Sequence, residues 1–206
     1  MRLTVIGATG GTGTEVTRQA LAAGYEVVAV ARDPAKMQVT GAQVVRAAIT
    51  DPDDLAAAMR DSDAVVSALG PRRGEKTSPL ASGARATIAA MDSEGVRRLV
   101  VVSASGFYVE EGEGLVVGKI AKPILRRLLR DNVADTREME TLVSASDTDW
   151  TIMRPSQLTN GPRRGKYKTA IDRYAGARIA RADLADAILA ALASPDTIGH
   201  RINVAY

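Results

Sequence analysis

Runs of β-branched and aliphatic residues alternate along the chain with longer, alanine-rich stretches in which apolar positions recur at helical spacing. The runs at 27–31 and 99–102 are almost continuously apolar, which is typical of parallel strands covered by helices on both faces. Strands are predicted at Leu3–Ile6, Glu26–Ala31, Gln43–Arg46, Ala64–Ala68, Arg98–Val102, Trp150–Met153 and Arg201–Val204. Helices are predicted between them, at Gly11–Ala23, Pro52–Met59, Pro79–Ser93, Val133–Ser146 and Ala182–Ala193. This alternation favours an α/β fold with a doubly wound parallel sheet.

The regular alternation breaks down after Met153. Residues 154–180 are rich in glycine, proline and basic residues, and we interpret them as a loop with a short excursion. In open α/β sheets, chain that follows the late strands usually walls the ligand crevice at the carboxyl ends of the strands. We therefore expect residues 1–206 to form one domain, with a small C-terminal substrate lobe at 154–180.

Two helix starts are marked in the sequence. Asp51 precedes Pro52, and Ser78 precedes Pro79. In each pair, a side chain that can cap a helix stands before a proline that suits the first turn. These signals predict where the two helices begin.

The residue types that are missing exclude several classes of chemistry. The chain has no cysteine, which removes disulfides, thiol nucleophiles, iron–sulfur clusters and cysteine zinc sites. Its 1 histidine, His200, leaves little material for a Ser-His-Asp triad or a multi-histidine metal site, so no metal is predicted. No apolar run reaches the roughly 18 residues that span a bilayer, and the first strand begins too early for a signal peptide. We expect a cytoplasmic protein without membrane contact.

The charge is nearly balanced, with 27 Lys and Arg against 24 Asp and Glu. Basic residues gather at 119–130 and at 163–168. Aromatic residues make up only 3% and none interleaves the first cluster, so nucleic-acid binding is not expected and an anionic small ligand is favoured. The first cluster also fits a basic amphipathic helix at a membrane surface. Pro123 interrupts it, which favours a helix that covers the substrate side or an interface.

A glycine-rich loop follows the first predicted strand directly and opens the first helix. Glycines in such a loop allow a tight turn and bring backbone N–H groups close to a pyrophosphate, and the helix N-terminus adds its positive dipole end. The position inside a βαβ unit is the context that this motif requires, and it predicts a Rossmann-type dinucleotide site. The predicted binding residues here are Gly7, Thr9, Gly10, Gly11, Thr12 and Gly13.

The residues after the second strand indicate which dinucleotide is bound. An NAD site usually has an acidic residue there for the ribose 2′-OH, whereas an arginine accommodates a 2′-phosphate. Arg32 follows the strand, and Lys36 stands one turn further on. Asp33 precedes Pro34 and is interpreted as the cap of the next turn. The sequence therefore favours NADP(H).

These motifs, in this order, resemble the atypical short-chain dehydrogenase/reductases, within them the NmrA-like and biliverdin-IXβ/flavin reductase branch. The resemblance covers nearly the whole chain and includes the segments 7–13, 31–36, 68–70, 83–85, 102–106, 149–155 and 181–185. It implies a Rossmann fold and a nicotinamide dinucleotide. It also implies reduction of flavins, quinones or tetrapyrroles as an activity common in this branch.

Further site residues are implied by this resemblance alone. Leu69 and Gly70 resemble neighbours of the cofactor ribose. Ser103 and Ser105 fall where the family places hydroxyls that face the nicotinamide, and they are the candidate catalytic residues; a purely structural role at the strand end is the alternative. The residues in the position where the family's backbone reaches the carboxamide are Pro155, Ser156 and Gln157.

The chain departs from the family pattern at the catalytic acid. No tyrosine is followed by a lysine four residues later, and the two family positions correspond to Asn132 and Thr136. The carboxylate often found beside the adenine is replaced by Ala47 and Ala48. Carbonyl reduction assisted by a tuned acid is therefore not expected.

The sequence as a whole predicts an NADPH-dependent reductase that passes hydride to a planar acceptor such as a flavin, a quinone or a tetrapyrrole. The alternative is an NmrA-type sensor that binds NADP(H) without turnover and regulates a partner, which the missing tyrosine and lysine keep open. A monomer or a homodimer is expected in either case.

Overall fold

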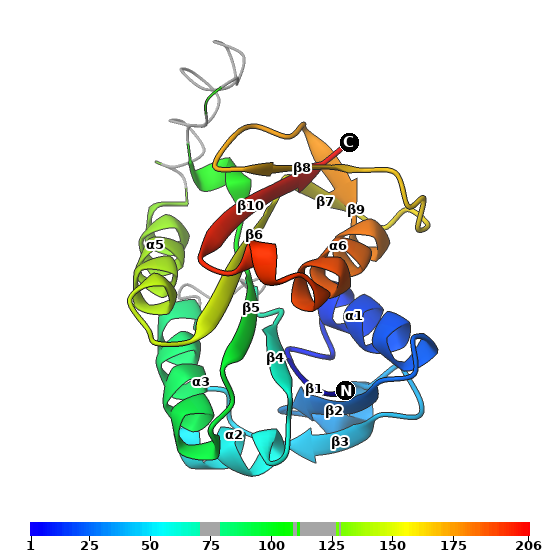
Figure 1. The fold of residues 1–206 in the computed structure, drawn as a ribbon, viewed down its shortest axis with the longest axis vertical. Helices are drawn as coiled ribbons and strands as arrows, with labels where there is room; N and C mark the ends of the chain where they lie inside the picture. Colours follow the sequence, from blue (N-terminus) through cyan, green and yellow to red (C-terminus); the bar gives the residue numbers. More distant parts are fainter. Residues whose placement is uncertain (71–78, 109–110, 112–126, 128) are drawn as a thin grey trace.

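A computed structural model describes residues 1–70, 79–108, 111, 127 and 129–206 of the chain. Its centre is an eight-stranded sheet in which every neighbouring pair is parallel except the last, which is antiparallel. Figure 1 shows the sheet between two layers of helices. In spatial order its strands are β3 (Gln43–Arg46), β2 (Glu26–Ala31), β1 (Arg2–Ile6), β4 (Ala64–Ser67), β5 (Arg98–Val102), β6 (Asp149–Pro155), β10 (His200–Ala205) and β8 (Lys168–Ile171).

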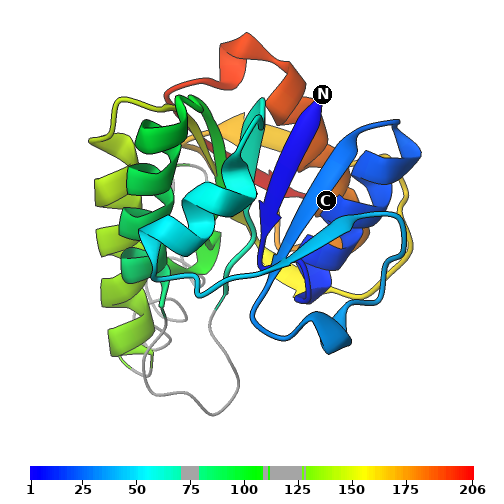
Figure 2. The same cartoon turned by 90° about the horizontal axis from the view of Figure 1, so that it is seen from below.

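The helices divide between the two faces of the sheet. Helices α1 (Gly11–Ala22) and α6 (Arg181–Ala193) contribute to the apolar cluster on one face. Helices α2 (Pro52–Met59), α3 (Leu80–Glu94) and α5 (Arg130–Ser144) contribute to the cluster on the other, as Figure 2 shows from below. The predicted doubly wound parallel Rossmann sheet is confirmed, and the order 3-2-1-4-5-6 within it is the one that binds dinucleotides.

Burial on both faces explains the continuous apolar runs of the sequence. Neighbouring residues of one strand enter opposite clusters, so Val65 packs with α2 and α3 while Val66 packs toward α1 and α6. The same holds for Val101 and Val100 of β5. A strand that is covered on both sides has no polar alternation. Among the described residues, no helix is long and apolar enough to cross a membrane.

One of the two predicted helix caps is confirmed, and the other, Ser78, lies outside the described residues. The Asp51 carboxylate accepts hydrogen bonds from the amides of Asp53 and Asp54, as expected for the cap of α2. Helix α3 begins at Leu80 rather than in the turn of Pro79, which occupies the cap position without a side-chain bond. Its cap comes instead from Asp135 of α5, which accepts from the amides of Leu80 at 2.9 Å and Ala81 at 3.1 Å. A neighbouring helix supplies the carboxylate, so local sequence cannot reveal it.

Several sequence predictions fall outside the described residues. Ser78 is one of them. The basic cluster at 119–130 is another, apart from Arg127, Leu129 and Arg130. Arg127 and Arg130 are exposed, and Arg130 begins α5, three residues before the predicted start of that helix.

The segment at 154–180 is more regular than predicted. Strand β6 continues to Pro155, and β7 (Gln157–Thr159) pairs in parallel with β9 (Arg178–Ala180). Strand β8 pairs with β10 and becomes the edge of the main sheet. The interpretation of this segment as a loop with a short excursion is therefore wrong where β7, β8 and β9 form, while residues 160–167 do form a loop. Strand β8 is short and mostly exposed, so it lacks an apolar pattern and forms by hydrogen bonding to the open edge of β10.

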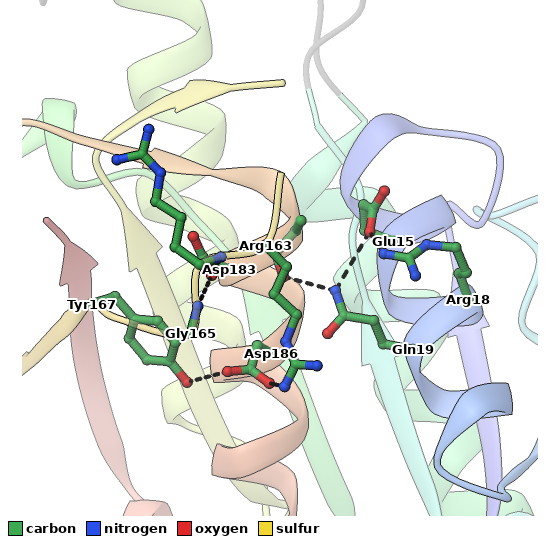
Figure 3. Close-up of polar contacts among 10 residues, drawn as sticks. Glu15, Arg18, Gln19, Arg163, Gly165, Tyr167, Asp183 and Asp186 are labelled. Atoms are coloured by element: carbon green, nitrogen blue, oxygen red, sulfur yellow. Dashed lines mark hydrogen bonds and ion pairs between the residues drawn. The ribbon is translucent and has the colours of Figure 1, made fainter. Parts of the chain in front are cut away.

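The basic loop at 163–168 is fastened to α6 by two buried or half-buried carboxylates (Figure 3). Asp183 accepts from the amides of Arg164 and Gly165, both at 2.8 Å, and from the Tyr206 hydroxyl at 2.5 Å. Burial opposes ionisation of Asp183, but these hydrogen bonds outweigh it and lower its pKa. Asp186 pairs with Arg163 and accepts from the Tyr167 hydroxyl, whose pKa is raised to about 12 by burial and by this carboxylate.

Replacing Asp183 with Asn tests this attachment. The substitution keeps the shape but removes the charge that strengthens the hydrogen bonds, so we expect a loss of about 2 kcal/mol in unfolding free energy at neutral pH. The folded-state pKa is lowered, so this stabilisation is complete above the ordinary carboxyl pKa of about 3.9 and is lost as pH falls through the folded value. Urea unfolding at several pH values measures it, with the exposed Asp92→Asn as control. A deficit of equal size at neutral and strongly acidic pH would contradict the account.

Candidate functional site

The loop between β1 and α1 is shaped by two glycines. Gly7 has φ of 79°, in the left-handed region that favours glycine. Its carbonyl accepts from the Gly10 amide at 2.9 Å, which closes the turn. A Cβ on Gly13 would lie 2.2 Å from the Gly7 carbonyl oxygen, so Gly13 is required for the helix to pack against the loop. The turn thereby aims the start of α1 at the carboxyl ends of the strands.

The N-terminus of α1 has no cap of its own. Gly10 occupies the cap position without a side-chain hydrogen bond, and the first turn holds no acidic residue. The amides of a first helical turn have no partner within the helix, and the helix dipole makes them attractive to an anion. A Cβ on Gly10 would meet only the Gly7 carbonyl oxygen, at 3.3 Å, so one face of Gly10 is open. These features fit a pyrophosphate-binding loop.

A cleft of about 580 Å³ opens at this point and brings most of the predicted site together. It runs across the carboxyl ends of β2, β1, β4 and β5, the place where doubly wound sheets bind ligands. The predicted binding residues that line it are Gly7, Thr9, Gly10, Gly11, Thr12, Arg32, Lys36, Leu69, Gly70, Ser103 and Ser156.

One end of the cleft is basic. Arg32 and Lys36 line it, and so does Asp33. Asp33 caps the short 3₁₀ turn Pro34–Lys36 through the Ala35 amide, as predicted, and its second oxygen lies 3.4 Å from the Lys36 ammonium group. Both carboxylate oxygens of Asp33 therefore have partners within the chain, and Arg32 lines the cleft beside them.

Four of the predicted site residues do not line the cleft. Gly13 lies behind the loop that it supports. Pro155 is buried as the last residue of β6, beside Val204 of β10, and Gln157 is exposed on β7. Ser105 is buried, with its Oγ 3.2 Å from the Ser156 Oγ. The glycine-rich loop predicts Gly13, whereas family position alone predicts the other three. Of Pro155, Ser156 and Gln157, only Ser156 lines the cleft.

Ser103 lies where β5 ends, and its hydroxyl donates to Glu140 of α5 at 2.5 Å. Both Glu140 and its ion-pair partner Arg154 are buried, and Arg154 donates to Glu140 through Nε at 3.0 Å and Nη2 at 2.5 Å. Burial opposes the charge on Arg154, but the hydrogen bond to Glu140 outweighs it and raises the pKa of Arg154. The Arg154 guanidinium stacks 3.8 Å from the centre of the Tyr108 ring.

Tyr108 stands behind this pair rather than in the cleft. Burial raises the pKa of its hydroxyl, and the negative charge of Glu140 raises it further. Such a tyrosine holds its proton more tightly than an ordinary one, the opposite of a tuned acid catalyst.

The cleft is also lined by residues outside the predicted site, among them Arg181, Phe107 and Leu158. Arg181 opens α6 beside the glycine loop, its Cδ 2.8 Å from the position of a Cβ on Gly11, and it donates to the Asn160 side chain at 2.6 Å. Phe107 and Leu158 give the other end of the cleft apolar surface. Packing of α6 against α1, held by the bond from Gln19 to the Ala182 carbonyl (Figure 3), brings Arg181 to the loop. Nothing in the local sequence marks this approach across the fold.

Comparison with known proteins identifies the family. A family model described as NAD(P)H-binding matches residues 7–195. The chain belongs to the NAD(P)H-binding family. One relative is the uncharacterized protein YwnB of Bacillus subtilis. It is 26% identical over 214 residues, which cover 99% of this chain and 98% of YwnB.

Solved structures share the fold over the full length of this chain. A Burkholderia pseudomallei protein described as exported matches with a TM-score of 0.84 at 28% identity, covering 100% of both chains. A short-chain dehydrogenase/reductase from Veillonella parvula, solved in complex with NADP, matches with a TM-score of 0.80 at 20% identity, covering 94% of that chain. ChuY, an anaerobilin reductase from Escherichia coli O157:H7, matches with a TM-score of 0.83 at 22% identity, covering 97% of that chain. The family model confirms the predicted NAD(P)H-binding family, and the solved structures confirm the predicted Rossmann fold.

Two glycine substitutions separate binding from folding. Gly10→Val should leave a folded protein that no longer binds NADPH, because the side chain would fill the open face of the loop. Gly13→Ala should instead destabilise the fold, because its Cβ would collide with the Gly7 carbonyl. Circular dichroism melts and NADPH titration by fluorescence measure the two effects. Unchanged NADPH affinity in folded Gly10→Val would contradict the pyrophosphate assignment.

Proposed function

We propose that this protein is an NADPH-dependent reductase that delivers hydride to a planar acceptor such as a flavin or a quinone. The observation that carries the proposal is the single continuous cleft that joins the uncapped N-terminus of α1 to an end lined by hydroxyl and apolar side chains. Membership of the NAD(P)H-binding family supports the cofactor class. When bound, the nicotinamide supplies the hydride, and the chain's task is to position it against the acceptor.

Binding of the cofactor is assigned to three groups of residues. The amides at Gly11 and Thr12 would hold the pyrophosphate, with Arg181 beside them as a further positive charge. Arg32 and Lys36 would hold a 2′-phosphate, and Asp33 caps the 3₁₀ turn through the Ala35 amide and pairs with Lys36, so it contributes to the shape of this turn. These residues favour NADPH over NADH.

The acceptor end of the cleft favours substrates that need no acid from the protein. Of its described lining residues, Ser103, Thr136 and Ser156 are neutral hydroxyls, and Phe107 and Leu158 are apolar. A ketone needs a proton at its oxygen as hydride arrives, whereas a flavin or quinone spreads the charge over a conjugated ring and can take its proton from water. The apolar side chains give such a ring a surface to lie on.

A second candidate function is a redox sensor that binds NADP(H) without turnover. The observation that favours it is Thr136, which lies in the cleft at the position that resembles the family's catalytic lysine. A small planar acceptor as the partner, a monomer or homodimer, and a cytoplasmic location all stay predictions.

The cofactor proposal predicts a selective effect of Arg32. Because a charge-assisted hydrogen bond contributes roughly 1.5–3 kcal/mol, Arg32→Ala should weaken NADPH binding about tenfold or more. NADH binding should stay nearly unchanged. Isothermal titration with both cofactors measures this, and Arg60→Ala, at an exposed position outside the cleft, is the matched control. Equal affinity of the native protein for NADPH and NADH would contradict the assignment of Arg32 to a 2′-phosphate.

The reductase proposal predicts turnover with a defined range of acceptors. Steady-state NADPH oxidation should be measurable with flavins or quinones and negligible with simple ketones and alcohols, because general acid catalysis contributes about 10²–10⁴-fold where it is needed. Ser105→Ala should cause less than about a tenfold loss, since Ser105 does not line the cleft. Tight NADPH binding without turnover of any acceptor would favour the sensor, and efficient ketone reduction would show that an acid has been overlooked.

A further inference from the structure

The hydroxyl groups at the acceptor end of the cleft have their protons committed within the protein. Ser103 donates to Glu140, Ser156 donates to the Gly176 carbonyl at 2.6 Å, and Thr136 donates to the Asn132 carbonyl at 2.7 Å. A hydroxyl has one proton to donate and two lone pairs that accept. Each of these side chains can therefore offer only an acceptor to a ligand in the cleft while its bond is kept.

The Ser103 bond is the one that a ligand would find hardest to redirect. Glu140 is only 4% exposed and is held by two hydrogen bonds from Arg154, with the Arg201 guanidinium also 3.6 Å away. A carboxylate only accepts hydrogen bonds, so the proton between Glu140 and Ser103 belongs to the serine. Hydrogen bonds to ionised groups are roughly twice as strong as neutral ones.

The partners of Arg154 keep this arrangement fixed. Its guanidinium lies between Glu140, the Tyr108 ring at 3.8 Å and the Asp172 carboxylate at 3.8 Å. With Arg154 fixed on several sides, Glu140 stays in place, and Glu140 in turn fixes the direction of the Ser103 proton.

The opposite end of the cleft has the reverse polarity. Thr9 and Thr12 line it, and within the described part of the chain neither hydroxyl donates to a protein group. The uncapped amides of α1 are also donors. The cleft thus changes from donors, which suit phosphate oxygens, to side-chain acceptors over the ends of β5 and β6.

We propose that the acceptor end recognises a conjugated heterocycle through an N–H group on its edge, such as the N3–H of an isoalloxazine ring, and that Glu140 is the positioning residue that makes Ser103 accept this bond. The inference rests on the proposed function, because it concerns the acceptor of the same cleft. A quinone has only carbonyl oxygens on its edge. These are acceptors like the Ser103 lone pairs, so no hydrogen bond forms between them. Flavin-like acceptors are therefore selected over quinones.

A pair of flavins that differ in this one group tests the inference by binding. Lumiflavin and 3-methyllumiflavin are titrated into the protein saturated with NADP⁺, and quenching of flavin fluorescence gives each Kd. We expect lumiflavin to bind about tenfold more tightly, because the methylated ring leaves the Ser103 acceptor unpaired in a partly desolvated site.

Two variants separate the proposed contact from simple steric exclusion of the methyl group. Ser103→Ala removes the acceptor and makes room, so the two flavins should bind within about twofold of each other. Glu140→Gln can donate its amide to Ser103 and release the serine proton toward the cleft, so it should also reduce the preference. Glu138→Gln, the same substitution on the exposed side of α5 where Glu138 pairs with Arg85, should keep the native preference.

The outcomes distinguish this inference from the proposed function. Equal Kd values in the native protein, no binding of either flavin, or a preference that survives in Ser103→Ala would each overturn it. A preference that Ser103→Ala abolishes but Glu140→Gln leaves intact would overturn the positioning role of Glu140. Because binding is measured without turnover, a selective but inactive protein would support this recognition while contradicting the reductase proposal.

Discussion

The uncapped N-terminus of α1 is the constraint on which the rest of the site depends. Gly7 turns the chain through a left-handed conformation, and Gly13 lets the first turn of α1 lie against the Gly7 carbonyl. Gly10, at the cap position, offers the amides of this first turn no side-chain acceptor. An anion bound there would complete their hydrogen bonds and interact with the helix dipole. The parallel sheet sets where this anion site lies, at the crevice between the strands that lead in opposite directions from β1.

The buried pair of Glu140 and Arg154 organises the other end of the cleft. Removing two such charges from water is costly, and it is offset here by two direct hydrogen bonds and by the bond from Ser103. Moving one partner away would leave the other as an uncompensated buried charge, so the pair resists rearrangement. Burial of this ion pair costs stability, and in return the cleft has a fixed pattern of hydrogen-bond donors and acceptors. That pattern, rather than a titrating acid, is what the described residues offer to a substrate.

The sequence was sufficient for the parts of the fold that local patterns encode. Strand β1, the glycine loop and Asp51 as a cap each follow from neighbouring residues, and the structure agrees. Features that depend on distant partners could not be predicted in this way. Asp135 caps α3 from another helix, β8 forms only because β10 has an open edge, and Arg181 reaches the loop because α6 packs on α1. The hydrogen bond of Ser103 could not be predicted either, because its hydroxyl donates to Glu140, which lies 37 positions away in the sequence.

The central claim is that α1 begins as an anion site for the cofactor pyrophosphate, and amide NMR tests it most directly. The ¹H–¹⁵N spectrum of the labelled protein is followed while NADP⁺ is added, and the signals of Gly11 and Thr12 are compared with those of the rest of the chain. The account predicts large, saturating downfield shifts at these two amides, as expected for new hydrogen bonds to phosphate oxygens. Saturable binding that leaves both amides unshifted and instead perturbs the loop at 163–168 would contradict it.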